Sequence, residues 1–183
     1  MIRIIGIDPG LAFLGIAVLD WDPKTDHASL VDVRVLTTKK SIRKEKILTS
    51  TDLTRRLEFL EDGFLHLLDH HAPTVAGFES ISMPRNASTT AKIGMIWGAC
   101  HALIRAREIP VYEFSPQEVR RGLNLRPGAG KQDIERVIVN RFSQYGDWPQ
   151  TTKGSLLDHG VDAAAVALLT THQRELRILK TLQ

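Results

Sequence analysis

Two apolar runs separated by a short turn open the chain. The first covers residues 4–7 and ends at Asp8, Pro9-Gly10 forms the turn, and the second covers residues 15–19. Strand-forming residues interrupted by a glycine-containing turn predict a hairpin in which both strands are largely buried. A carboxylate at the end of a buried strand is costly unless a cation or hydrogen bonds compensate it. On this stretch alone, a functional role for Asp8 and local capping of its own turn fit equally well.

The later pattern alternates strands with helices. Residues 29–36 alternate as a third strand should, whereas residues 37–51 are basic, lack apolar periodicity and predict a mobile loop. Leu and Phe at helical spacing predict a helix that begins near Asp52 and ends before Pro73. Further strands are predicted at 74–79 and 110–114, and further helices at 87–107, from Pro116, at 132–145 and from Leu157.

This order predicts an α/β fold. An antiparallel hairpin followed by strand–helix crossovers implies a mixed five-stranded sheet with helices on both faces. The chain of 183 residues contains no repeat or linker, so we expect one domain over 1–183. One helix has a face of small residues, which we expect to pack within the chain rather than against a second copy; it comprises Ala87, Ala91, Gly94, Gly98 and Ala102.

Composition and charge narrow the class of protein. The hydrophobic content of 43% and the charged content of 25% are typical of a globular domain, and no apolar run is long enough to span a bilayer. The N-terminus lacks the pattern of a signal peptide, so we expect a cytoplasmic protein that does not associate with membranes. The single Cys100 excludes an internal disulfide and a cysteine-based zinc cluster.

Basic residues are clustered although the net charge is only +3. The clusters favour a polyanionic partner, although a solvated surface would explain either one alone. They comprise Lys39, Lys40, Arg43, Lys44 and Lys46, and then Arg120, Arg121, Arg126 and Lys131 around a glycine-rich loop.

Acidic residues recur where buried elements end or begin. Glu79 closes the strand at 74–79 as Asp8 closes the first, and neighbouring strand ends would bring both carboxylates to one divalent metal. On the last helix, Asp158 and His159 each share a face with Asp162. Individually, Glu79 could pair with an arginine and the helix acids could complement the helix N-terminus. Together they fit a two-metal site for phosphodiester hydrolysis.

Four stretches, in order, resemble the RuvC family of Holliday-junction resolvases, which has the RNase H-like fold. The resemblance covers nearly the whole chain and is carried by Gly6-Ile7-Asp8-Pro9-Gly10, by Phe78-Glu79 with Asn86, Lys92, Gly94 and Gly98, by Ser115–Arg120 with Gly128–Gln132, and by His159–Ala164.

The resemblance implies roles for individual residues. Asp8, Glu79, His159 and Asp162 would be catalytic ligands of two Mg²⁺ ions, for which Mn²⁺ would substitute, and Asp158 would lie outside this ligand set as a supporting or capping residue. The implied DNA contacts are Lys131 near the scissile phosphate, together with Arg120, Arg121, Arg85 and Lys92. Independently of the family, a lysine in a glycine-rich loop at a helix start favours a phosphate contact.

The implied activity is paired, metal-dependent cleavage of four-way DNA junctions in recombination and repair by a homodimer, with branch-migration machinery as a further partner. Three features depart from the family pattern. Leu14-Gly15-Ile16-Ala17 replaces Thr-Gly-x-Gly, Ser82 replaces an aromatic residue that wedges into the junction, and the basic segment 37–51 is longer. They indicate a divergent, phage-type member.

Other activities remain open at this point. A broader RNase H-like nuclease would cut flaps, forks or RNA, and a non-catalytic module would only bind branched DNA. The set of acids argues against a pure binder, because carboxylates repel phosphates. A sugar-kinase or actin-like ATPase also begins with such a hairpin, but it needs a second lobe that 183 residues do not supply.

Overall fold

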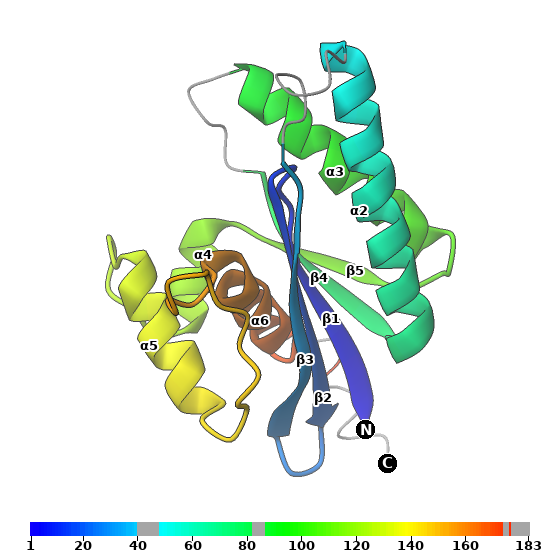
Figure 1. The fold of residues 1–183 in the computed structure, drawn as a ribbon. Coiled ribbons are helices and arrows are strands. Elements are labelled where there is room, and N and C mark those ends of the chain that lie inside the picture. The colour runs from blue at the N-terminus through cyan, green and yellow to red at the C-terminus, as the bar shows by residue number, and fades with distance from the viewer. Residues whose placement is uncertain (40–47, 82–86, 174–175, 177–183) are drawn as a thin grey trace.

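The fold is built on one mixed sheet of five strands (Figure 1). The computed structural model describes residues 1–39, 48–81, 87–173 and 176. The strands lie in the order β3-β2-β1-β4-β5. The antiparallel pairs are β1–β2 and β2–β3, and the parallel pairs are β1–β4 and β4–β5. Their bounds are Ile2–Asp8 for β1, Phe13–Asp22 for β2, His27–Thr37 for β3, Val75–Glu79 for β4 and Val111–Phe114 for β5.

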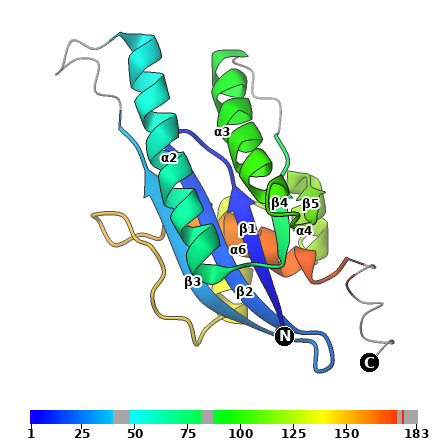
Figure 2. The same ribbon diagram turned by 90° about the vertical axis from the view of Figure 1, so that its right-hand side faces the viewer.

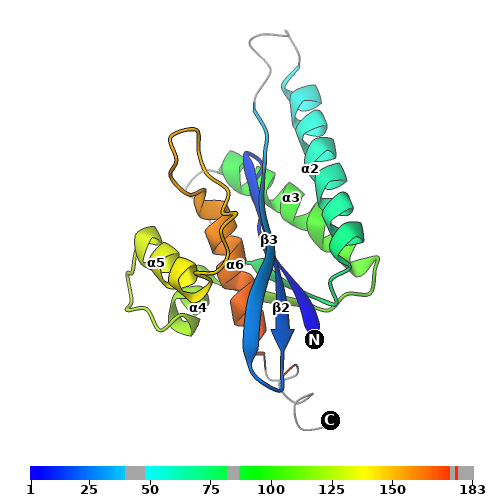
Figure 3. The ribbon, with the colours of Figure 1, turned by 60° about the horizontal axis from the view of Figure 1, so that its bottom comes forward.

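Helices cover both faces of the sheet, as Figures 1 and 2 show. One face carries α2 (Thr49–His71) and α3 (Ala87–Arg105). The other carries α4 (Pro116–Gly122), α5 (Lys131–Arg141) and α6 (Asp158–Thr170), which Figure 3 shows grouped together. The predicted α/β architecture, with its leading hairpin and its mixed sheet, is therefore confirmed.

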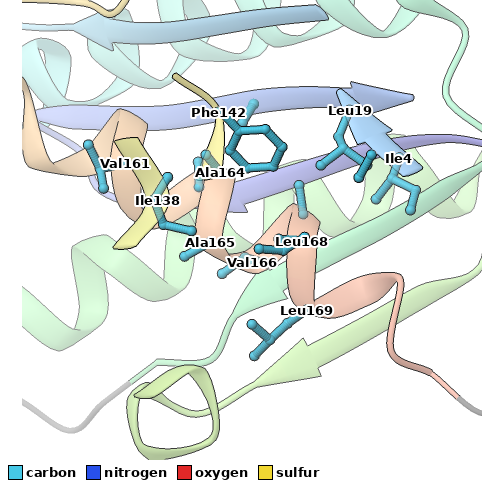
Figure 4. Packing of buried hydrophobic residues seen from close by; sticks show 14 of the residues in the cluster. Ile4, Leu19, Ile138, Phe142, Val161, Ala164, Ala165, Val166, Leu168 and Leu169 are labelled. Carbon is cyan, nitrogen blue, oxygen red and sulfur yellow. The ribbon is translucent and has the colours of Figure 1, made fainter. Parts of the chain in front are cut away.

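Alternation along the strands divides the core into two layers. In β1, Ile5 and Ile7 pack toward α2 and α3, whereas Ile4 packs toward α6. Figure 4 shows the second layer, where the apolar side chains of α6 meet Ile138 and Phe142. By the same alternation, Asp8 lies on the α6 face of the sheet.

Glycines on three neighbouring strands allow α6 to lie close against the sheet. A Cβ at Gly6 would come within 2.2 Å of the Ala163 carbonyl oxygen, and one at Gly15 within 1.9 Å of the His159 carbonyl oxygen. A Cβ at Gly77 would meet the Thr170 hydroxyl at 2.2 Å. The strand glycines and the alanines of α6 therefore fit together, and this contact brings the start of α6 to the ends of β1 and β4.

The observed elements follow the predicted order, and their boundaries differ from the prediction by a few residues, most at the end of α5. The capping box of α4 is present: the Glu118 amide donates to Ser115 Oγ, and the Ser115 amide donates to the Glu118 carboxylate. The helix predicted at 132–145 ends at Arg141, because the chain then turns and the Tyr145 hydroxyl accepts a hydrogen bond from the Val33 amide at 2.8 Å.

The small-residue face of α3 differs from its prediction. Ala91 and Ala102 are exposed, and a Cβ at Gly98 would meet nothing within 4 Å among the described residues. The expected packing within the chain is therefore wrong for most of this face, because α3 packs on the sheet through Ile96, Cys100 and Ile104 instead.

Two predicted features lie outside the described residues. These are most of the basic segment 37–51, with Lys40, Arg43, Lys44 and Lys46, and the stretch that holds Ser82 and Arg85. Within the described ranges, no helix is long and apolar enough to cross a membrane.

Candidate active site

Three acidic side chains meet where β1 and β4 end. The two strands are parallel neighbours with Ile7 opposite Phe78, so Asp8 and Glu79 follow at the same edge and on the same face. Asp162, on the first turns of α6, completes the group. Oxygen atoms of the three carboxylates lie within 4.8 Å of one another.

His159 joins this group through Asp8. Its Nδ1 lies 2.5 Å from Asp8 Oδ2, and the side chain is 32% exposed. His159 is one helical turn before Asp162, so both point from α6 toward the sheet edge. Sequence reasoning did not anticipate its other neighbour: the Phe13 ring at the start of β2 stacks on the imidazole, with ring centroids 5.3 Å apart.

Burial and repulsion from neighbouring carboxylates raise the pKa of two of these acids, Glu79 and Asp162. Burial, followed by the charges of Asp8 and Asp162, raises the pKa of Glu79 to about 8. Burial and the charge of Asp8 raise the pKa of Asp162 to about 6. The hydrogen bond to Asp8 raises the pKa of His159, because it stabilises the imidazolium. The cluster therefore attracts protons or cations.

A hard divalent cation suits this donor set. Mg²⁺ prefers carboxylate oxygens, and the three carboxylates converge closely enough to share one ion. A bound cation would offset the repulsion between carboxylates that contributes to the raised pKa values of Glu79 and Asp162. His159 could supply a nitrogen ligand beside Asp8, although its ring is not among the three mutually close donors found in the described part of the chain.

Lys131 lies on the open side of the acidic cluster. Its Nζ is 3.2 Å from Asp158 Oδ2 and 3.6 Å from Asp162 Oδ2, and 60% of the side chain is exposed. Burial opposes its charge, but the carboxylates of Asp162 and Asp158 raise the pKa of Lys131 overall. Asp158 is thus a partner of Lys131 at the rim and lies outside the three-carboxylate group.

Arg120 and Arg121 have different environments although they are adjacent. Arg120 donates from Nε to the Ala129 carbonyl and from Nη1 to the Pro116 carbonyl, at 2.9 and 3.0 Å. It therefore braces the glycine-rich loop, and it also lines a small hollow with Glu79 and Lys131. Arg121 lines a separate, larger hollow of 740 Å³ beside the same loop.

Lys92 lies on the opposite side of the catalytic edge. It lines a hollow of 330 Å³ together with His159, Phe13 and Arg56. The remaining predicted contact, Arg85, lies outside the described residues.

Arg56 is a supporting residue that the sequence pattern did not reveal. It lies on α2, and its guanidinium donates to Thr38 Oγ1 at 2.8 Å and to the Leu11 carbonyl at 3.2 Å. The Thr38 hydroxyl also donates to the Leu11 carbonyl. These bonds fix the turn directly after Asp8 to α2. The interaction depends on tertiary contact across 45 residues, so no local motif signals it.

The proton affinity of Glu79 predicts how stability depends on pH and metal. Because its pKa rises from 4.5 to about 8 on folding, the free energy of unfolding of the metal-free protein should fall between these pH values. Glu79→Gln removes this effect, so in EDTA at pH 8 the variant should be more stable than the parent by roughly 2 kcal/mol.

Thermal unfolding at pH 5 and pH 8, with and without Mg²⁺, measures this difference. The two proteins should be similar at pH 5, and Mg²⁺ should stabilise the parent alone. Glu113→Gln, at an exposed position on β5, serves as the control. A Glu79→Gln variant that is less stable than the parent in EDTA at pH 8 would contradict the assignment.

Comparisons with known proteins point to one family. The family described as "Crossover junction endodeoxyribonuclease RuvC" matches residues 4–172. A protein of that name from Xanthomonas oryzae pv. oryzae is 28% identical over 179 residues, which cover 95% of this chain and 90% of that protein. One from Stenotrophomonas maltophilia is 28% identical over 174 residues, with the same coverage of both chains.

Solved structures share the fold. The Thermus thermophilus RuvC in complex with a Holliday junction substrate has a TM-score of 0.69 at 21% identity and covers 92% of this chain and 91% of its own. The yeast mitochondrial Holliday junction resolvase has a TM-score of 0.63 at 17% identity and covers 99% of this chain and 84% of its own. The family match extends over nearly the whole chain and includes every residue of the acidic cluster. This chain therefore belongs to the RuvC family of crossover junction endodeoxyribonucleases.

Proposed function

We propose that this protein resolves four-way DNA junctions by metal-dependent hydrolysis of one phosphodiester bond in each of two strands. The observation that carries the proposal is the convergence of Asp8, Glu79 and Asp162, within 4.8 Å, in a chain of the RuvC family. A pure DNA-binding module has no use for three converging acids that repel the phosphate backbone.

The three carboxylates and His159 would hold two Mg²⁺ ions. When bound, such ions activate a water molecule and stabilise the departing oxygen of a phosphodiester. The role of the chain is to fix this ligand set: β1 and β4 hold Asp8 and Glu79 at one sheet edge, and the contact of α6 with Gly6 and Gly15 holds Asp162 against them.

Lys131 would contact the scissile phosphate. Its ammonium is exposed at the rim, 3.6 Å from Asp162, so an incoming phosphate could exchange with the carboxylates as its partner. Exposed Arg121 extends the positive charge along the glycine-rich loop, while Arg120 holds the shape of that loop. We assign Arg85 and Lys92 to contacts with the DNA backbone. Lys92 would make its contact from the hollow beside His159.

A Lys131→Ala variant tests this phosphate contact. We expect the cleavage rate to fall by about 100-fold and junction affinity by only a few-fold, because one of many backbone contacts is lost. Single-turnover kinetics measure the cleavage rate, and binding titrations over a range of salt concentrations measure the affinity. The slope of log affinity against log salt concentration should become less steep by about one. Arg136→Ala, an exposed cation on α5, is the control. An unchanged cleavage rate for Lys131→Ala would remove Lys131 from the site.

We propose that the protein acts as a homodimer, because paired incision needs two active sites. The open face of α3 supports this proposal. Ala91 and Ala102 are exposed, and a Cβ at Gly98 would meet no atom of the described residues within 4 Å, so a second α3 could approach closely.

Gly98→Glu tests the dimer face. We expect the parent to sediment as a dimer and the variant as a monomer, because a charge would be buried without a partner. The variant should nick single strands of the junction without paired incision. Gly146→Glu is the control, because a Cβ at Gly146 also meets no atom of the described residues within 4 Å, and this variant should sediment as the parent does. A dimeric Gly98→Glu protein would exclude this face.

Substrate choice tests the function itself. The parent should cut a four-way junction in Mg²⁺ with symmetrical paired incisions, and more rapidly than a flap, a fork or an RNA–DNA hybrid. Preferential hydrolysis of the hybrid would favour a general RNase H-like activity instead.

A further inference from the structure

The hollow beside His159 has the features of a nucleotide site. Its volume is 330 Å³, and it lies between the turn at residues 10–12, the start of β2 and the first turns of α3. Its lining includes the aromatic ring of Phe13 and the cationic side chains of Arg56 and Lys92. It is next to the catalytic group, because His159 both lines it and contacts Asp8.

Phe13 is unusual because its large apolar ring is 37% exposed although charged side chains surround it. One face of the ring stacks on His159, with an angle of 17° between the ring planes. The side chain also lines the hollow. Aromatic side chains exposed in this way in DNA-binding grooves provide surfaces on which unpaired bases stack.

The two cations of the hollow differ in what they can offer a ligand. Arg56 is 11% exposed and uses its guanidinium to hold Thr38 and the Leu11 carbonyl. Lys92 makes no ion pair within the described ranges and remains available to a phosphate. Thr89 lines the same hollow from the first turn of α3, where backbone amides also favour anions.

We propose that this hollow binds the nucleotide adjacent to the scissile phosphate, with its base stacked on Phe13 and its phosphate on Lys92. The inference rests on the proposed junction cleavage. It assigns to Phe13 the selection of a nucleotide whose base is unstacked. A base on Phe13 would extend the existing stack with His159, so a correctly placed strand would also fix the imidazole beside Asp8.

This arrangement favours branched DNA over a regular duplex. A base inside a duplex is stacked on both sides and must leave its neighbours to reach Phe13, whereas bases at a branch point are already partly unstacked. Phe13 would therefore favour cleavage close to the junction centre.

A cycle that combines protein and DNA changes tests the contact. Four junctions are prepared, one intact and three with a single abasic site at successive positions next to the cleaved bond. We expect Phe13→Leu to lower kcat/KM on the intact junction by about 10-fold. At one of the three positions, the abasic site should lower the rate of the parent by a similar factor, and the two changes together should cause no further loss. Phe13→Trp keeps an aromatic surface and should lower kcat/KM on the intact junction by less than Phe13→Leu does.

The opposite results are equally specific. If Phe13→Leu lowers the rate by the same factor on the intact junction and on every abasic junction, Phe13 acts only by holding His159, and the nucleotide site is wrong. An unchanged rate on the intact junction also excludes it. Cleavage of the intact junction by the parent tests the proposed function separately. Three further junctions without abasic sites, each with 2-aminopurine at one of the same positions, are bound in Ca²⁺, and their fluorescence reports stacking on Phe13 even without cleavage.

Discussion

An Asp8→Asn variant should lose junction cleavage by at least about 1,000-fold, equivalent to roughly 4 kcal/mol of transition-state stabilisation. Asn keeps the size of the side chain but removes the charge that lies within 4.8 Å of Glu79 and Asp162. It also weakens the partner of His159, whose Nδ1 is 2.5 Å from Asp8 Oδ2. The remaining ligands cannot hold a divalent cation with the same affinity or geometry.

Junction binding by this variant should be close to that of the parent, because affinity comes from basic residues that the change does not touch. Single-turnover cleavage in Mg²⁺ and a binding titration separate the two effects. Asp158→Asn is the matched control, since Asp158 is 48% exposed and pairs with Lys131 outside the carboxylate group. We expect its rate to change by only a few-fold. An Asp8→Asn protein that cuts at the parent rate would refute the assigned site.

Gly15→Ala should disrupt the protein through a single methyl group. The Cβ of the new alanine would lie 1.9 Å from the His159 carbonyl oxygen. This oxygen belongs to the backbone of α6, so the clash cannot be relieved by moving a side chain. We expect a loss of about 3 kcal/mol in the free energy of unfolding, or failure to fold. Any folded fraction should cleave slowly, because α6 must move away from β2 and carries His159 and Asp162 with it.

Chemical denaturation and cleavage kinetics measure these two effects together. Gly146→Ala is the control, because an added Cβ there meets nothing within 4 Å among the described residues. Parent-like stability and activity of Gly15→Ala would show that the close contact between α6 and the sheet is not needed for the site.

The strand-end acids were predictable because strand geometry is regular. Alternation along β1 and β4, and their parallel pairing, bring Asp8 and Glu79 together without any knowledge of the loops. Helical spacing likewise puts His159 and Asp162 on one face. The close contact of the α6 alanines with Gly6, Gly15 and Gly77 was recognised only in the structure.

The features that the sequence did not reveal all depend on tertiary contacts. The stacking of Phe13 on His159 joins residues at opposite ends of the chain, and Arg56 reaches the turn after Asp8 from α2. The small-residue face of α3 was assigned to packing within the chain because composition alone does not say which side of a helix meets the sheet. The family resemblance implied a DNA contact for Arg120, and the structure adds the hydrogen bonds from its guanidinium to the Ala129 and Pro116 carbonyls, which no local sequence pattern signals.

The metal site itself is tested most directly by anomalous diffraction from crystals of the protein soaked in Mn²⁺. We expect an anomalous peak between the carboxylates of Asp8, Glu79 and Asp162, within coordination distance of all three, with a second beside His159. Peaks only at other acidic positions, with none at this cluster, would contradict a metal-dependent nuclease centre at the ends of β1 and β4.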